Sequence, residues 1–157
     1  MKKLILILAL TFLAGSLFAA EMEEWTWEDY KVSFQVPSDF KVLKSDDKQF
    51  SASNANIRMT IFPVKGKAIT AEKLVDNLVK WVDQNKIVYD AEKDLDVIED
   101  LNGYLCAYVI GVKEAKQVFG GLIVNPADFS IRLYVLITYK QDDYDTGLAM
   151  LKSFTPQ

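Results

Sequence analysis

Hydrophobic and polar residues alternate without a break from position 30 to position 36. One side of this pattern carries Tyr30, Val32, Phe34 and Val36, and the other carries Lys31, Ser33 and Gln35. A period of two is typical of a strand with one buried face and one face in water. Pro37 follows; it lacks an amide hydrogen and begins a turn, so the strand is expected to end there.

Similar patterns predict three hairpins further along the chain. They join residues 49–53 to 57–62, 95–101 to 104–112, and 117–125 to 129–140. Pro63 is expected to close the first. Asn102-Gly103 connects the second, because these residues readily take the positive backbone angles of a tight turn. Residues 87–89 fit a short additional strand.

The strands differ in how much cover they need. Residues 104–112 are nearly all apolar, which indicates that both faces are covered. In the last strand the apolar positions Ile131, Leu133, Val135 and Ile137 alternate with a mixed set, Arg132, Tyr134, Leu136 and Thr138. That mixed face predicts partial cover.

Two segments have helical periodicity. Residues 71–85 follow Thr70, a good N-cap, and carry an apolar stripe formed by Leu74, Leu78, Trp81 and Val82. A shorter helix is expected over 143–153. Hairpins with helices packed on their sheet predict one α+β domain over residues 20–157, with an antiparallel β-sheet.

The first residues have the order of a secretory signal peptide. Lys2 and Lys3 precede a short apolar run, and small residues follow at Ala19 and Ala20. We predict a signal peptide over 1–19, with cleavage after Ala19 or Ala20. The apolar run is interrupted and shorter than the ~20 residues that span a bilayer, and no later segment is suited to cross one. The mature chain is therefore expected to be exported, to the periplasm or outside the cell.

Charge and cysteine content narrow the function classes. The net charge is −4, from 18 basic and 22 acidic residues, and loss of Lys2 and Lys3 lowers it to −6. Nucleic-acid-binding proteins usually concentrate positive charge, so we expect no nucleic-acid partner. Cys106 is the single cysteine. An internal disulfide is impossible, and stability must come from the core.

Several stretches together resemble the PsbP-like superfamily. They are "YKVSFQVPSDFKV", "TAEKLVDNLVKWV", "LNGYLCAYVIGV", "FSIRLYVLITYK" and "LAMLKSF", in this order. The resemblance covers nearly all of the mature chain and implies an α/β/α sandwich around an antiparallel sheet. It also implies partner binding rather than chemistry, since members include an extrinsic photosystem II subunit, a factor that binds the GTPase Ran, and bacterial exported proteins of unknown role.

The sequence contains no histidine, which removes the usual general base, the Ser-His and Cys-His pairs and the commonest zinc ligand. Cys106 lies in the most apolar predicted strand and is interpreted as an inert core residue. The aspartates of "DDYD", residues 142–145, do not have the spacing of a calcium loop and fit a helix start. Gly120-Gly121 indicates a bulge or a close packing point rather than a phosphate loop. We therefore predict no catalytic residue, metal or cofactor.

The stretch "EEWTWEDY" leaves two interpretations open. Trp25 and Trp27 share a face of an extended chain, but their parity is opposite to that of Tyr30 and Val32. A turn or bulge at Glu28-Asp29 would reset the register and let both rings close the end of the core. Otherwise Trp25, Trp27 and Tyr30 form an exposed aromatic site for a partner, because Trp and Tyr dominate binding hot spots.

Three functions follow, in order of preference. The first is an exported non-enzymatic binding or accessory domain whose partner is another envelope or extracellular protein. The second is a carrier of a small apolar ligand held between sheet and helix. The third is a hydrolase that uses only carboxylates, with Asp94, Asp96 or Glu99 as candidates; it would need two carboxyl groups converging in a cleft.

Overall fold

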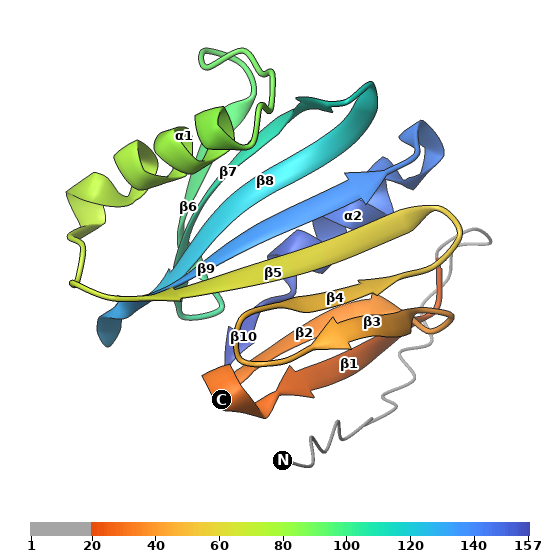
Figure 1. The fold of residues 1–157 in the computed structure, drawn as a ribbon, viewed down its shortest axis with the longest axis horizontal. Coiled ribbons are helices and arrows are strands. Elements are labelled where there is room, and N and C mark those ends of the chain that lie inside the picture. The colour runs from red at the N-terminus through yellow and green to blue at the C-terminus, as the bar shows by residue number, and fades with distance from the viewer. Residues whose placement is uncertain (1–19) are drawn as a thin grey trace.

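The computed structural model describes residues 20–157 (Figure 1). The predicted signal peptide therefore lies outside the described residues. In chain order the elements are β1 (Met22–Trp27), η1 (Glu28–Tyr30), β2 (Val32–Pro37), β3 (Lys41–Ser45), β4 (Phe50–Ser53), β5 (Ile57–Lys65), η2 (Ala71–Lys73), α1 (Leu74–Gln84), β6 (Leu95–Leu101), β7 (Tyr104–Lys113), β8 (Lys116–Asn125), β9 (Asp128–Tyr139), η3 (Gln141–Asp143), α2 (Tyr144–Lys152) and β10 (Thr155–Pro156).

The strands form two antiparallel sheets. The larger has seven strands in the order β3-β4-β5-β9-β8-β7-β6, and the smaller has three in the order β1-β2-β10. Helix α1 packs on β7 and β8, while α2 packs against β8, β9 and β2. Figure 1 shows α1 alongside β7 and β8, and α2 behind the large sheet near the three-stranded one. The predicted α+β class, with an antiparallel sheet and helices packed on it, is confirmed.

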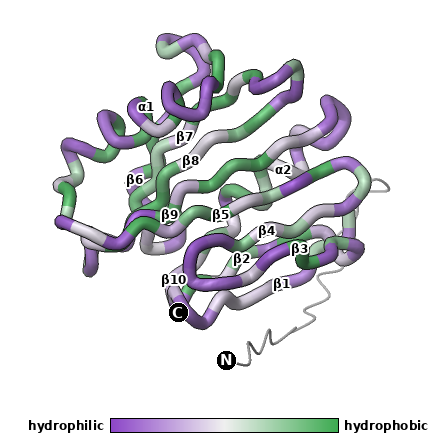
Figure 2. Tube along the Cα trace, viewed as in Figure 1, coloured by the Kyte–Doolittle hydropathy of each residue, from purple (hydrophilic) through white to green (hydrophobic). Residues whose placement is uncertain are grey.

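Two hydrophobic clusters lie on the two faces of the seven-stranded sheet. The cluster under α1 includes Leu74, Leu78 and Val82 of the helix, and it packs on the even-numbered side chains of β8 and β9. The cluster on the other face joins the sheet to α2 and to the three-stranded sheet. Figure 2 shows the hydrophobic residues following β7, β8 and β9, with hydrophilic residues in the connecting loops. Both faces of β7 are covered along most of its length, as its composition predicts.

The predicted 30–36 strand begins two residues late. Tyr30 belongs to the 3₁₀ turn η1, and Lys31 follows in the left-handed region with φ 50°. Ser33 was expected in water but is buried, because β2 lies between β1 and β10 in the smaller sheet. Its hydroxyl lies 2.8 Å from the Thr26 hydroxyl.

Pro63 does not close its strand, contrary to the prediction. β5 continues to Lys65, and Pro63 stands opposite Leu133 of β9. The pairing of β4 with β5 reaches only to Ile61, so at Pro63 one edge of β5 has no partner strand within the described chain. Proline is tolerated at such an edge because no ladder needs its missing N–H.

The sequence patterns do not predict three of the strands, and they overstate one segment. β1, β3 and β10 are the strands without a prediction, and β3 and β10 are short pieces without clean alternation. Residues 87–89 form only one bridge, between Val88 and Val112. The last helix, expected over 143–153, is a 3₁₀ turn followed by α2, and α1 is likewise preceded by a 3₁₀ turn after Thr70.

Glycines act at a turn and at two packing points. Asn102 and Gly103 have φ of 52° and 97°, which confirms the tight turn between β6 and β7. Gly120 and Gly121 mark close packing rather than a bulge: a Cβ on Gly120 would lie 3.1 Å from Ile87 Cδ1, and one on Gly121 would lie 3.1 Å from Leu151 Cδ1. The pair lets elements on both faces approach β8 closely.

Candidate functional site

The structure resolves the question of the two tryptophans in favour of the core. η1 and the left-handed Lys31 change the phase of the chain, so β1 and β2 turn their apolar side chains to the same layer. Trp25 is 5% exposed and Trp27 is 4% exposed. Both rings pack against Phe50 of β4, with centroid distances of 6.1 and 5.8 Å. The predicted turn at Glu28-Asp29 therefore closes the end of the core.

Tyr30 keeps a half-buried ring at the rim of this cluster. Its ring packs on the Trp27 ring with 4.5 Å between the centroids, and Nζ of Lys65, a residue of β5, lies 4.8 Å from the centroid of the Tyr30 ring. The hydroxyl donates to the carbonyl of Asp47. Burial, followed by the negative charges of Asp47, Asp29 and Asp46, raises the pKa of Tyr30. A partner-binding role for Trp25, Trp27 and Tyr30 stays a prediction, and Tyr30 is the member that solvent reaches.

The three candidate carboxylates of a hydrolase have different surroundings. Asp96 accepts a hydrogen bond from the Tyr108 hydroxyl at 3.3 Å, on the face of the sheet that α2 covers. Asp94 Oδ2 accepts from the backbone amide of Asp90 at 3.0 Å, which ties it to its own turn. Glu99 is an exposed residue of β6, the edge strand of the sheet. β6 thus presents a charged, solvated edge, which discourages pairing with a strand of another chain.

Cys106 is fully buried in β7. Burial, with a contribution from the negative charge of Asp96, raises the pKa of the Cys106 thiol to about 12. A thiol that stays protonated and enclosed is a poor nucleophile. Among residues 20–157, no group of three or more Cys, Asp or Glu side chains is placed to hold a metal ion.

One part of the large sheet is less covered than the rest. On the α1 side, Phe62 and Val64 of β5 and Leu136 and Thr138 of β9 lie beside the helix rather than beneath it, and all four are half-buried or exposed. We call these four residues the open sheet surface. The partial cover predicted for the mixed face of β9 is therefore present at Leu136 and Thr138.

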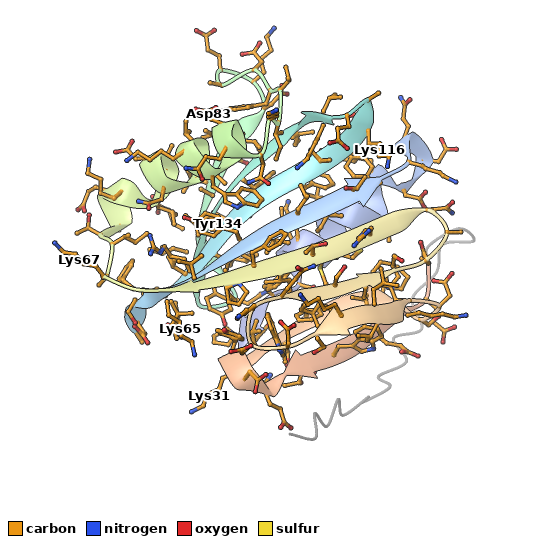
Figure 3. The ribbon with its side chains drawn as sticks, viewed as in Figure 1. Lys31, Lys65, Lys67, Asp83, Lys116 and Tyr134 are labelled. Carbon is orange, nitrogen blue, oxygen red and sulfur yellow. The ribbon has the colours of Figure 1, made fainter. Side chains whose placement is uncertain are left out.

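An aromatic stack borders the open sheet surface along α1. Trp81 of the helix stacks on Tyr134 of β9 with ring centroids 5.1 Å apart and planes 23° apart, and Phe62 lies 6.4 Å from Trp81. Figure 3 shows Tyr134 between β9 and α1. Arg132 Nη1 donates to Asn77 Oδ1 at 3.3 Å, which ties the end of β9 to the helix. This stack fixes the rim of the surface.

Five cations lie on the α1 side at one end of the sheet, and we call them the basic band: Lys41, Arg58, Lys113, Lys116 and Lys140. Strand register places them there. Lys41 pairs with Ser53, Ser53 with Arg58, and Arg58 with Thr138. Lys113 pairs with Lys116, which Figure 3 shows at the start of β8. Cations from distant parts of the chain come to one end of one face only through the strand order, so the sequence patterns did not reveal the band.

No helix within residues 20–157 has the length and apolar character to cross a membrane. No model of a known protein family matches the chain, and no curated protein matches it.

Solved structures do match the described chain. The solution structure of cyanobacterial PsbP from Synechocystis sp. PCC 6803 matches with a TM-score of 0.59 and 10% identity, over 93% of this chain and 98% of that chain. The Ran-binding protein Mog1p of Saccharomyces cerevisiae matches with a TM-score of 0.53 and 11% identity, over 88% and 96% of the two chains. A crystal structure from Bacteroides thetaiotaomicron matches with a TM-score of 0.52 and 14% identity over 81% of this chain, which spans 45% of that one.

At such identities the likeness is one of fold. It agrees with the element order and with the antiparallel sheet flanked by helices described above. The resemblance found in the sequence is confirmed at this level: the chain has a PsbP-like fold.

Proposed function

We propose that this chain is an exported, non-enzymatic binding domain whose open sheet surface contacts another protein of the envelope or outside the cell. Export is inferred from the predicted signal peptide over residues 1–19. The non-enzymatic part is supported by the lack of histidine in the sequence and by the different hydrogen-bond partners of Asp94 and Asp96. The protein-binding part is supported by the surface itself.

The observation that carries the proposal is the unequal cover of the large sheet. α1 packs on β7 and β8, while β5 and β9 beside it keep apolar side chains half-exposed, with an aromatic stack at their rim. Exposed apolar positions bordered by polar ones are a common mark of protein contact sites. The similarity to Mog1p, a Ran-binding protein, is in keeping with a protein partner.

The space between α1 and the sheet supports protein binding more than ligand carriage. Leu78 and Val82 of the helix and Leu122 of β8 are fully buried there and belong to one packed cluster. Tyr134, a residue that would line a ligand site, is itself buried under Trp81.

Affinity capture tests the proposal. Tagged residues 20–157 are incubated with the native envelope fraction, and retained proteins are identified by mass spectrometry. We expect a specific partner whose retention falls at least about tenfold for Thr138→Glu, since a new charge on the open surface must be desolvated on docking. The matched control is Val97→Glu, a solvent-exposed strand position on the far edge of the same sheet.

Equal retention by wild type and by folded Thr138→Glu would overturn the proposal that this surface binds. Far-ultraviolet circular dichroism and the melting temperature establish that both variants fold. Export is tested separately, by the N-terminal sequence of the protein recovered from the envelope fraction. An N-terminus at Ala20 or Glu21 supports export, and an intact Met1 contradicts it.

A further inference from the structure

The basic band is an unusual arrangement for a chain of this charge. The chain carries four more acidic than basic residues, yet the α1-side positions of β3, β5, β7 and β8 at this end are occupied by cations. Lys113 stands directly opposite Lys116. Gln117 pairs with Tyr139, which brings Lys116 of β8 and Lys140, the residue that follows β9, to the same end of the sheet. Three lysines thus gather at the ends of three neighbouring strands.

The Lys113–Lys116 pair is unfavourable in the isolated protein. Side chains directly opposite on neighbouring strands have Cβ atoms about 4.5–5.5 Å apart, and like charges at that spacing repel. Within residues 20–157, three lysines outside the band have carboxylate partners, in the pairs Lys44–Asp46, Lys73–Asp76 and Lys93–Asp90. In that same part of the chain, no carboxylate lies within ion-pair distance of a band residue.

Hydrogen bonds to uncharged groups also hold one residue of the band. Lys140 Nζ donates to Asn56 Oδ1 at 2.9 Å, and the Lys140 amide donates to the Asn56 carbonyl at 3.3 Å. These bonds hold the lysine at the end of β9 without reducing its charge. Lys41, Arg58, Lys116 and Lys140 are exposed, and Lys113 is half-buried. The charges are therefore fixed by strand ends and open to a ligand.

We propose that the basic band binds a carboxylate-rich segment of a partner protein, with an apolar side chain of the same segment resting on the open sheet surface. This inference rests on the proposed function and deepens it by giving the chemistry of the partner. Leu136 of β9 lies four residues before Lys140, which continues the strand in an extended conformation, about 13 Å at the usual rise of a strand. One short extended segment spans that distance.

Charge distribution favours a short acidic segment over a nucleic acid or an anionic membrane. A phosphate polymer or a lipid surface extends well beyond one end of a small sheet. It would meet acidic residues elsewhere, such as Glu23 and Glu24 of β1 and Asp96 and Asp100 of β6. Arg58 can bind a carboxylate of such a segment through two parallel N–H donors.

Fluorescence anisotropy tests the inference with a defined probe. The probe is a fluorescein-labelled peptide of alternating glutamate and leucine, titrated with residues 20–157 at low salt. We expect binding that weakens as sodium chloride is added, and that falls about tenfold for the double variant Lys116→Glu/Lys140→Glu. The matched control Lys93→Glu/Lys152→Glu makes the same charge change at exposed sites outside the band and should bind within about twofold of wild type.

Several outcomes would overturn the inference. The first two are equal binding of the probe by Lys116→Glu/Lys140→Glu and by wild type, and equal binding by wild type of a peptide with glutamine in place of glutamate. The third is tighter binding of wild type to single-stranded RNA or to phosphatidylglycerol vesicles than to the probe. The fourth is self-association in sedimentation that the band variant abolishes. The last would make a second copy the occupant. If a captured envelope partner is lost with Thr138→Glu but kept with the band variant, the proposed function stands and the acidic segment does not.

Discussion

The two faces of the seven-stranded sheet are built from the same strands but completed in different ways. One face is enclosed by α2 and by the three-stranded sheet, and it carries a cluster that includes Phe34, Phe119 and Phe154. The other is covered by α1 over β7 and β8, while β5 and β9 keep half-exposed residues. An enclosed face has its contacts fixed within the chain, whereas a partly covered face keeps contacts available to a partner.

Adjacent residues of β9 offer the sharpest way to break this comparison. Val135 is fully buried on the enclosed face, and Leu136 is half-buried on the open one. We expect Val135→Asp to cost several kcal/mol, because a carboxylate would be buried without a partner, and to leave little folded protein. Leu136→Asp should cost about 1 kcal/mol. Urea unfolding measures both, and comparable losses would contradict the difference between the faces.

The next largest effect is expected at Trp27. Its ring contacts Tyr30 and Phe50, so Trp27→Ala should cost about 3–5 kcal/mol in urea unfolding. Trp27→Phe is the matched control. It keeps an aromatic ring, and it removes an indole N–H that has no hydrogen-bond partner within the described chain. We expect it to cost about 1–2 kcal/mol. A Trp27→Ala variant that remains stable but no longer retains the captured envelope protein would instead support a binding role for Trp25 and Trp27.

Gly111 of β7 tests how tightly residues 87–89 pack on the α1 side of the sheet. A Cβ there would lie 2.6 Å from the Val88 carbonyl oxygen and 2.8 Å from Ile87 Cγ2. Gly111→Ala must therefore push residues 87–89 away from β7, at about 1–3 kcal/mol. Hydrogen exchange gives a local readout, since the Val88 amide donates to the Val112 carbonyl at 2.9 Å. Unchanged protection of that amide would show that the segment does not move.

Alkaline pH should reveal the smallest effect, on the enclosed face. Burial raises the pKa of Cys106 from 9.0 to about 12, and burial raises that of Tyr104 from 10.0 to about 12. A raised pKa in the folded state means that the unfolded chain loses its proton first. The stabilisation is complete below about pH 9 and declines as pH rises toward 12. Urea midpoints between these limits should fall less steeply for Cys106→Ala than for wild type.

Local sequence patterns predict an element correctly where its structure depends only on residues close together in the chain. The hairpin from β6 to β7 was predicted with its turn because Asn102-Gly103 favours positive φ and the strands on either side are long. α1 was predicted from its apolar stripe, of which Leu74, Leu78 and Val82 are buried. Pro63 was misread because its effect depends on whether a neighbouring strand needs its N–H, and only the pairing of β4 with β5 decides that.

The candidate site was far less predictable than the fold. The alternation of residues along the chain does not decide whether Trp25 and Trp27 are buried or exposed. In the structure they are buried, because the left-handed backbone of Lys31 changes the phase of the alternation. The basic band could not be foreseen, because Lys41 and Lys113 are far apart in the chain and only the strand order places β3 and β7 in the same sheet.

The sequence by itself determined the alternation of strands and helices, the inert surroundings of Cys106 and the chemistry ruled out by the lack of histidine, since these follow from residue type and local period. Only the tertiary structure decided which strands became neighbours, which half of a face stayed uncovered and where the cations gathered. Pairing between distant strands is governed by side-chain packing and backbone hydrogen bonds that no local window contains.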